Sequence, residues 1–417
     1  MRIIKLTAAV EESLLRARES EDRQAMKAAT RIVSDVRRRG DAALEEWARK
    51  LDGVELQRDG LWVSRKEFVA AQKRVGKEFL RAVEHAAKNV RRVAEKQLPA
   101  QWTMKVERGV TIGQKVQPLE SIGCYIPGGR FALFSTLVMT VVPAQVAGVQ
   151  RIVAVCPKAN DELLAAANLL GVKALGRVGG PQAIAALAYG TKRMTRVEKI
   201  FGPGNRFVTA AKKMVSADCA IDLPAGPTEA VVLAQHGNAR WMAADLLAQA
   251  EHAPDAGSYL VTTSRKLAEA VQAEIAEQLK NLPENNPAQV SIRQNGAILL
   301  TGSKQAAVDF VNRFAPEHLS LPGAEKEILR EIRSAGTIFL GPLSAQAFGD
   351  YASGSNHVLP TGGWARRRGG LSATDFVKCI SLQKIDRAGF LRLQADVQTL
   401  ARAEGLLAHA NAVEVRK

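Results

Sequence analysis

The chain has 417 residues, 47% of them hydrophobic and 24% charged, which is enough for two domains with separate cores and excludes a fibre or a largely disordered protein. The net charge of +16 is compatible with nucleic acid, an anionic cofactor or a merely basic surface. The basic residues are spread along the chain and only 5% of residues are aromatic, so we do not expect nucleic-acid binding as the main function.

The N-terminal segment lacks the uninterrupted apolar core of a signal peptide. Four widely separated cysteines form no Cys-x-x-Cys pair, which is typical of reduced thiols and not of a disulfide framework or a thiolate zinc site. We therefore expect a cytoplasmic protein.

Residues 8–98 are predicted to be mostly helical. Between Phe79 and Gln97, apolar residues recur every three or four positions and so occupy one face of a helix. The longest apolar stretch, Phe131–Val149, is interrupted by polar residues and by Pro143. This stretch is predicted to be buried in a core and not to span a membrane.

From Gly123 onward, strands are predicted to alternate with helices. Asn160 or Asp161 is expected to cap one of these helices, which ends before Gly171. The predicted strands are 151–156, 229–234, 258–262, 297–300 and 337–340. The alternation predicts an α/β fold with parallel sheets covered by helices on both faces, and the tail after residue 372 is predicted to form two helices.

Three glycine-rich turns are candidates for ligand binding, although the dinucleotide fingerprint GxGxxG is absent. They are Gly123–Arg130, Val178–Ala183 and Phe201–Phe207. The last two stand where a strand passes into a helix, and there free backbone N–H groups favour an anion while glycine permits close approach. Each alone is better explained as a tight turn, and the three together make a nucleotide cleft an equal alternative.

Histidine is scarce, and four of the six histidines lie in polar settings: His252, His318, His357 and His409. Gln249 and His252 are three positions apart and share a helix face, while Asp350 and His357 stand at the two ends of a polar loop. Imidazole, carboxylate and amide groups together suit zinc. The candidate ligands are dispersed, however, and each histidine alone is also explained by a structural role.

Glu317 and His318 are adjacent and could divide acid–base work, with histidine as proton acceptor and glutamate as activator of a water. The alternative for this pair is an ion pair or a helix cap. Cys156 could serve as a nucleophile in aldehyde oxidation, but its place at the end of an apolar strand favours a buried, inert thiol.

At these residues the chain resembles the histidinol dehydrogenase family. The matching stretches are GCYIPGG, VGGPQAIAALAYGT, KIFGPGNRFVTAAK, IDLPAGPTE, ADLLAQAEHAPD, FAPEHLSL, GDYASGSNHVLPTGG and EGLLAHANAV, in family order from about residue 120 to the C-terminus. The departures are Arg130 after GCYIPGG, Ala253 where glycine is common, and an unusually basic segment at Trp364–Ser372.

The resemblance implies oxidation of L-histidinol through L-histidinal to L-histidine with two NAD⁺, the last steps of histidine biosynthesis. Carried over by motif, the ligands of one zinc per subunit are Gln249, His252, Asp350 and His409. His318 takes the role of base and Glu317 that of water activator. The substrate would contact these residues and also Thr228, His357 and Glu404, and the cofactor contacts would be Tyr125, Gln182 and Asn205.

The family fold implied by the resemblance consists of two incomplete Rossmann-like domains with small helical extensions. Residues 1–20 would form an N-terminal extension, 21–124 with 228–371 the first domain carrying the zinc and catalytic residues, and 125–227 the NAD-binding domain. Residues 372–417 would reach the active site of the partner in a homodimer, and neither membrane nor nucleic acid is expected as a partner. The main alternative is a related zinc- and NAD-linked dehydrogenase of another small alcohol, against which Glu404, His357 and His409 favour histidinol.

Overall fold

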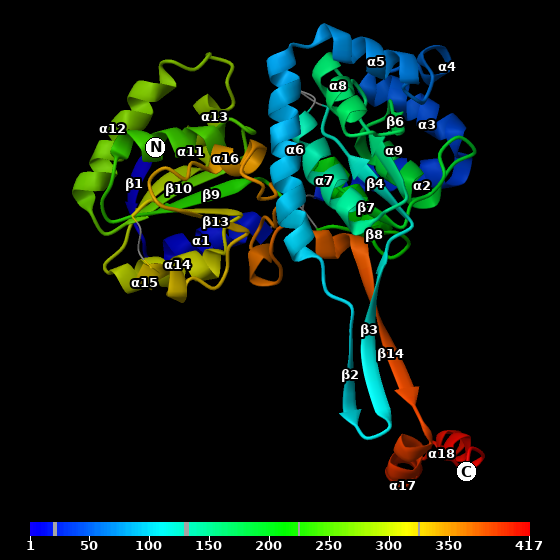
Figure 1. Cartoon of the computed structure of the whole chain (residues 1–417). Coiled ribbons are helices and arrows are strands. Elements are labelled where there is room, and N and C mark those ends of the chain that lie inside the picture. The colour runs from blue at the N-terminus through cyan, green and yellow to red at the C-terminus, as the bar shows by residue number, and fades with distance from the viewer. Residues whose placement is uncertain (20–22, 129–132, 224–225, 324–325) are drawn as a thin grey trace.

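The computed structural model describes residues 1–19, 23–128, 133–223, 226–323 and 326–417. Two α/β bodies lie side by side, and a long arm extends from one of them (Figure 1). Each body has its own parallel sheet, which confirms the predicted fold class. Within the described part of the chain, no helix is long and apolar enough to cross a membrane.

The first body is built on a six-stranded parallel sheet of order β1-β11-β10-β9-β12-β13. Its strands are β1 (Arg2–Lys5), β9 (Glu229–Leu233), β10 (Gly257–Thr262), β11 (Gly296–Leu300), β12 (His318–Leu321) and β13 (Thr337–Leu340). Alternate residues point to opposite faces: Val232 packs under one helical layer and Val231 under the other. One layer contains α11 (Ala239–Ala250), α12 (Arg265–Leu279) and α13 (Ala288–Gln294), and the other contains α1 (Ala8–Glu19), α14 (Lys304–Phe314) and α15 (Lys326–Glu331).

The second body is built on a five-stranded parallel sheet of order β6-β5-β4-β7-β8. Its strands are β4 (Ser121–Tyr125), β5 (Arg151–Val155), β6 (Ala174–Gly176), β7 (Lys199–Phe201) and β8 (Ala220–Ile221). One face is covered by α2 (Arg23–Arg39), α3 (Asp41–Trp47) with the π-helical Ala48–Asp52, α9 (Gly180–Tyr189) and α10 (Arg206–Val215). The other face carries α5 (Arg65–Arg74), α6 (Lys77–Gln97), α7 (Phe134–Ala147) and α8 (Asp161–Leu169). The short α4 (Leu56–Asp59) follows the π-helical segment in the chain and precedes α5.

This packing differs from the partition implied by the resemblance, which grouped residues 21–124 with 228–371. Helices α2 to α6 instead cover the five-stranded sheet, because the apolar stripes of α2 and α6 pack on its two faces. The N-terminal residues do not stand apart either, since β1 pairs along β11 and completes the edge of the six-stranded sheet.

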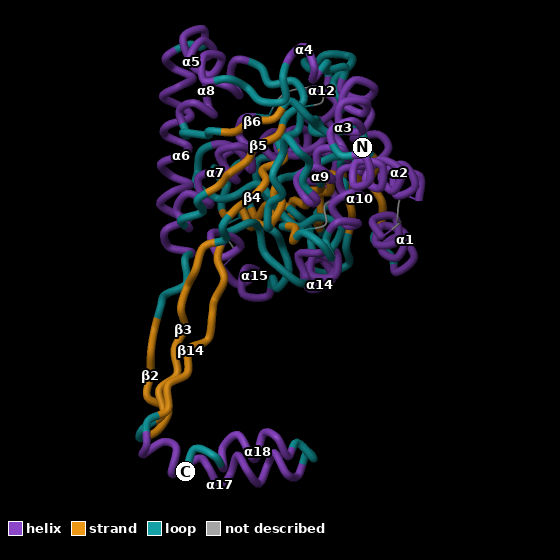
Figure 2. The backbone as a smooth tube through the Cα atoms, turned by 90° about the vertical axis from the view of Figure 1, so that its right-hand side faces the viewer, coloured by secondary structure: helices purple, strands orange, loops and turns teal. Residues whose placement is uncertain are grey.

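The arm is a three-stranded antiparallel sheet that projects from the five-stranded body (Figures 1 and 2). It consists of β2 (Trp102–Glu107), β3 (Val110–Pro118) and β14 (Val377–Ile385), and it ends in α17 (Arg387–Ala403) and α18 (Leu407–Glu414). The two tail helices confirm the prediction for the C-terminus, whereas the three strands of the arm were not predicted. Strands β2 and β14 are largely exposed, and β3 between them is mostly half-buried. The sequence does carry a strand signal here, since Trp102, Met104 and Val106 alternate with polar residues, and the sequence analysis missed it.

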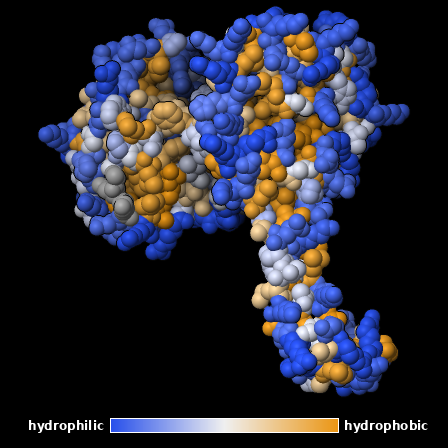
Figure 3. Space-filling view, in the orientation of Figure 1, coloured by the Kyte–Doolittle hydropathy of each residue, from blue (hydrophilic) through white to orange (hydrophobic). Residues whose placement is uncertain are grey.

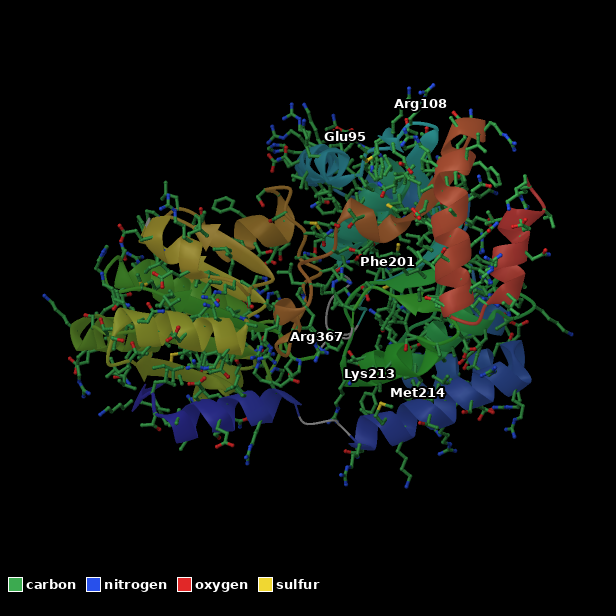
Figure 4. The ribbon with its side chains drawn as sticks, turned by 90° about the horizontal axis from the view of Figure 1, so that it is seen from below. Glu95, Arg108, Phe201, Lys213, Met214 and Arg367 are labelled. Atoms are coloured by element: carbon green, nitrogen blue, oxygen red, sulfur yellow. The ribbon has the colours of Figure 1, made fainter. Side chains whose placement is uncertain are left out.

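The basic segment near residue 366 joins the two bodies, together with the 3₁₀ turns Trp364–Arg366 and Ala373–Phe376 and the short α16 (Gln346–Tyr351). Arg366 donates to the carbonyl of Arg313 in the six-stranded body at 2.6 Å, and Arg368 donates to the carbonyl of Asp222 in the five-stranded body. Arg367 lies between the bodies (Figure 4), with its guanidinium 4.7 Å from the ring centroid of Trp364. The basic run therefore has a structural use at the junction of the two bodies.

Candidate active site

The predicted acid–base pair lies at the start of β12, where the chain turns sharply out of α14. Ala315 makes this turn with φ of 50°, the only positive φ among non-glycine residues that the structure describes. In the parallel register His318 is paired with Ala230, so Glu317 and His318 lie beside the first residues of β9. Both side chains are buried, and the imidazole stacks on Phe339 with ring centroids 5.9 Å apart.

Hydrogen bonds hold the carboxylate of Glu317 in place. Its Oε2 accepts from Thr228 Oγ1 at 2.5 Å and from the backbone N–H of Glu229 at 2.9 Å. Gln249 in turn donates from Nε2 to Thr228 Oγ1 at 2.6 Å. The structure thus brings together three residues that the sequence placed in separate motifs.

The imidazole of His318 is fixed as one tautomer. Its Nδ1 lies 3.3 Å from the backbone carbonyl of Glu229, and since a carbonyl only accepts, Nδ1 carries the proton of the neutral ring. Nε2 is left as the basic atom, 3.9 Å from Asp350 Oδ1. Burial lowers the pKa of His318, although the charge of Asp350 opposes this, so the ring stays neutral at neutral pH.

Burial has the opposite effect on the neighbouring carboxyl and raises the pKa of Glu317 to about 7, against the hydrogen bonds from Thr228 and Glu229. A carboxyl group with a pKa near neutrality both releases and holds a proton at physiological pH. The pair therefore combines a neutral base with a carboxyl group poised to exchange a proton, which is what acid–base catalysis requires.

His357 links the polar loop to the second body. Its Nδ1 lies 2.9 Å from the carbonyl of Asp350, and its Nε2 lies 3.3 Å from Thr136 Oγ1 on α7. Burial lowers the pKa of this histidine to about 4, so it is neutral. The sequence-predicted residues Asp350 and His357 thus lie together, directly beside the acid–base pair.

The predicted metal ligands are only partly assembled in one chain. Gln249 is buried near the end of α11. His252, two residues beyond that helix, lies near enough to Glu317, His318 and His357 for a positive charge on it to lower the pKa of each. Asp350 completes the group. In contrast, the fourth predicted ligand, His409, lies on α18 at the far end of the arm, and the predicted substrate contact Glu404 lies there too, directly after α17 (Figures 1 and 2). Among the described side chains of one chain, no three His, Cys, Asp or Glu groups form a metal-binding cluster.

The predicted cofactor residues lie at the carboxyl ends of strands in the five-stranded sheet, where ligands of open α/β sheets bind. Tyr125 ends β4, and its hydroxyl accepts from the backbone N–H of Gly180 at 3.1 Å. Gln182 lies in the first turn of α9 and donates to Asp52 Oδ2 at 3.0 Å, while its Oε1 is buried with no hydrogen-bond partner in the described structure.

Asn205 also has a structural use, because its Oδ1 caps α10 by accepting from the N–H groups of Phe207 and Val208, each at 3.1 Å. The preceding turn needs glycine at position 202, where φ is +113° and a Cβ atom would lie 2.1 Å from the carbonyl oxygen of Tyr125. Of the Gly123–Arg130 turn, Gly129 and Arg130 lie outside the described residues.

Three residues around these sites were missed by the sequence analysis. Asp52 accepts from the N–H of Gly179 at 3.0 Å as well as from Gln182, and Glu229 contacts both members of the acid–base pair. Arg18 forms a buried ion pair with Glu229. Asp52 and Arg18 belong to helical segments without a specific motif, and Glu229 lies in a matching stretch but drew no attention beside Thr228.

Cys156 is buried, as predicted, and burial raises the pKa of its thiol to about 12. At neutral pH the reactive thiolate form is therefore essentially absent.

Comparison with known proteins agrees with this arrangement. A sequence model of histidinol dehydrogenase matches residues 15–417. The chain belongs to the histidinol dehydrogenase family. It is 46% identical over 392 residues to the histidinol dehydrogenase of Methanothermobacter thermautotrophicus, covering 92% of each chain. It is 45% identical to that of Geobacillus kaustophilus, covering 97% of this chain and 96% of the relative.

The solved structure of histidinol dehydrogenase from Elizabethkingia anophelis superposes with a TM-score of 0.92 at 36% identity, covering 100% of this chain and 98% of that one. An acetylating aldehyde dehydrogenase from Geobacillus thermoglucosidasius shares the fold at a TM-score of 0.51 and 11% identity, over 88% of this chain and 99% of that chain. Membership of the histidinol dehydrogenase family places the chain among the oxidoreductases of histidine biosynthesis.

Proposed function

We propose that the chain oxidises L-histidinol through L-histidinal to L-histidine, with zinc and two NAD⁺, at a site that two subunits share. The observation that carries this proposal is the buried pair Glu317–His318 beside Asp350, Thr228 and Gln249. A base and a water-activating carboxyl group are the two acid–base groups that the oxidation of an alcohol to a carboxylate requires.

His318 acts as the base through Nε2, because Nδ1 is committed to the carbonyl of Glu229. It removes the hydroxyl proton in the first oxidation and a proton of the aldehyde hydrate in the second. Glu317 accepts a proton from the water that adds to the aldehyde carbon, and Thr228 and the Glu229 N–H hold it for that purpose. Since hydration precedes the second oxidation, no covalent bond to a cysteine is needed.

The donor set fits zinc. Gln249 uses its amide nitrogen to donate to Thr228, which leaves the amide oxygen for a cation, and His252 and Asp350 add an imidazole and a carboxylate. His409 of a second copy would be the fourth ligand. Bound there, zinc would hold the imidazole and amino nitrogens of the substrate in position.

The cofactor proposal rests on Tyr125, Gln182 and Asn205, which lie at or beyond the carboxyl ends of three strands of the five-stranded sheet. The buried Oε1 of Gln182 lacks a partner in the described structure, which costs free energy, and a hydroxyl group of bound NAD⁺ would satisfy it. Bound there, NAD⁺ would supply the hydride acceptor for each oxidation. Because all four cysteines are free thiols, which suits a reducing compartment, we place the reaction in the cytoplasm.

The exposed arm is evidence in favour of the proposed dimer. Apolar side chains are exposed on its strands and on the tail helices (Figure 3), including Leu400 at 66% and Leu407 at 69% exposure. Such a segment gains little stability on its own, and a second copy related by a twofold axis supplies a surface to cover it. The same exchange would carry His409 and Glu404 to the partner's site.

Two experiments test this function. The first compares NADH formation from histidinol with that from a panel of other amino alcohols and diols, and faster turnover of another alcohol would contradict the substrate. The second mixes His318→Ala with His409→Ala homodimers by unfolding and refolding. With random mixing about half of the dimers are heterodimers with one intact site, so about a quarter of wild-type activity should return. A mixture that stays inactive although heterodimers form would refute the shared site.

A further inference from the structure

Glu229, at the start of β9, contacts both members of the acid–base pair through its main chain. Its N–H donates to Glu317 Oε2 at 2.9 Å, and its carbonyl oxygen lies 3.3 Å from His318 Nδ1. The first contact orients the carboxylate and the second sets the tautomer that makes Nε2 the base. A shift of the backbone at Glu229 would therefore misplace both Glu317 and His318.

The side chain of Glu229 is held by a residue from the N-terminal helix. Arg18, in the last turn of α1, donates from Nε to Glu229 Oε2 at 2.7 Å and from Nη2 to Oε1, which is a bidentate pair. The side chains are only 10% and 5% exposed, respectively. Two parallel hydrogen bonds to a planar guanidinium fix the direction of the carboxylate as well as its distance.

Arg18 also holds the segment that leads into the pair. Its Nη1 donates to the carbonyl of Phe314, the last residue of α14, and the guanidinium stacks 3.7 Å from the centroid of the Phe314 ring. Phe314 stands three residues before Glu317. One side chain thus connects the start of β9 with the turn that delivers Glu317 and His318.

We propose that Arg18 is a positioning residue of the reaction, which aligns Glu317 and His318 by clamping Glu229 and the end of α14. This inference rests on the catalytic roles proposed above for Glu317 and His318. Stability alone gives a weaker account of the pair, because a buried ion pair contributes little compared with well-packed apolar side chains of the same volume.

The test uses Arg18→Met, which removes the charge and the hydrogen bonds to Glu229 and Phe314 but keeps an unbranched apolar stem. Displacement of a reacting group by about 1 Å costs up to ~10²-fold in rate, so kcat should fall roughly 10- to 100-fold with histidinol and with histidinal. The KM for both substrates should stay within about twofold of the wild-type value, because Arg18 contacts no residue that is predicted to bind substrate or zinc. Arg18→Lys should recover part of kcat.

A matched control is Glu11→Gln. Glu11 pairs with Arg313, whose Nη2 donates to Oε2 at 2.9 Å, and so ties the same helix α1 to α14 without contact to Glu229. This variant should keep wild-type kcat. An equal loss in Glu11→Gln, or wild-type kcat in a folded Arg18→Met, would overturn the proposal.

If Arg18→Met does not fold, the double variant Arg18→Met/Glu229→Gln removes both buried charges and should fold. Its kcat should remain low because the clamp is still missing, and wild-type kcat would overturn the proposal. Glu317→Gln and His318→Gln are measured alongside. Full activity in these two would refute the proposed catalytic roles, and the clamp with them, whereas their loss together with an active Arg18→Met would refute the clamp alone.

Discussion

Replacing Lys212 by methionine should destabilise the five-stranded body and weaken NAD⁺ binding. Lys212 is 2% exposed and forms an ion pair with Asp222, whose side chain is fully buried. Its Nζ also donates to the carbonyl of Gly202 at 2.9 Å, and Asp222 accepts from the N–H of Gly202 at 2.8 Å. The pair therefore holds both the N–H and the carbonyl group of Gly202, in the turn that leads to Asn205.

The expected loss in the free energy of unfolding follows from the burial of this ion pair. Lys212→Met leaves Asp222 with its backbone N–H donors but without its ion-pair partner, and breaking one side of a buried pair costs about 3–5 kcal/mol. This is a large part of the roughly 5–15 kcal/mol that stabilises a typical domain. The double variant Lys212→Met/Asp222→Asn should lose less, because no buried charge remains. The exposed pair Arg37–Asp218, at 3.7 Å, is the control, and Arg37→Met should cost less than about 1 kcal/mol.

Urea unfolding monitored by circular dichroism measures the change in the free energy of unfolding. The KM for NAD⁺ shows whether the turn around Gly202 still binds the cofactor. In the folded Lys212→Met enzyme KM for NAD⁺ should rise while KM for histidinol stays the same. The reasoning is refuted if Lys212→Met unfolds at the wild-type urea concentration, or if the double variant is less stable than the single one.

Three further predictions concern the chemistry. Chelation should abolish turnover and zinc should restore it, and full activity in a preparation verified as metal-free would contradict the zinc proposal. Cys156→Ser should remain active. Iodoacetamide at pH 8 should not modify Cys156, because burial raises the pKa of this thiol to about 12 and it stays protonated at that pH. A loss of kcat by orders of magnitude in a folded Cys156→Ser variant would instead indicate covalent catalysis. His318→Gln should lower kcat by ~10²–10⁴-fold with both histidinol and histidinal, whereas Glu317→Gln should slow chiefly the oxidation of histidinal, and equal losses in both variants on both substrates would exclude this division of roles.

The core elements of the two sheets could be predicted because their signals are local. Strands β5, β9, β10, β11 and β13 appear as short apolar runs, and Asn160 caps α8 as predicted by accepting from Leu163 N–H at 3.0 Å. The four-residue edge strand β1 is too short to give such a signal. Strands β2 and β14 carry a different one, an alternation of apolar and polar residues, which the sequence analysis did not use. Their apolar side chains are exposed within one chain, so the alternation does not mark a face of either core.

The sequence by itself determined the α/β class, the adjacency of Glu317 and His318, and the motifs that contain Thr228, Gln249 and Asp350. Only the tertiary structure decided which sheet each N-terminal helix covers, and that Glu229, Arg18 and Asp52 belong to the two sites. The reason is that parallel pairing places residues nearly ninety positions apart side by side, as with His318 and Ala230. Such a register depends on how whole strands and helices pack, and no local spacing of residue types encodes it.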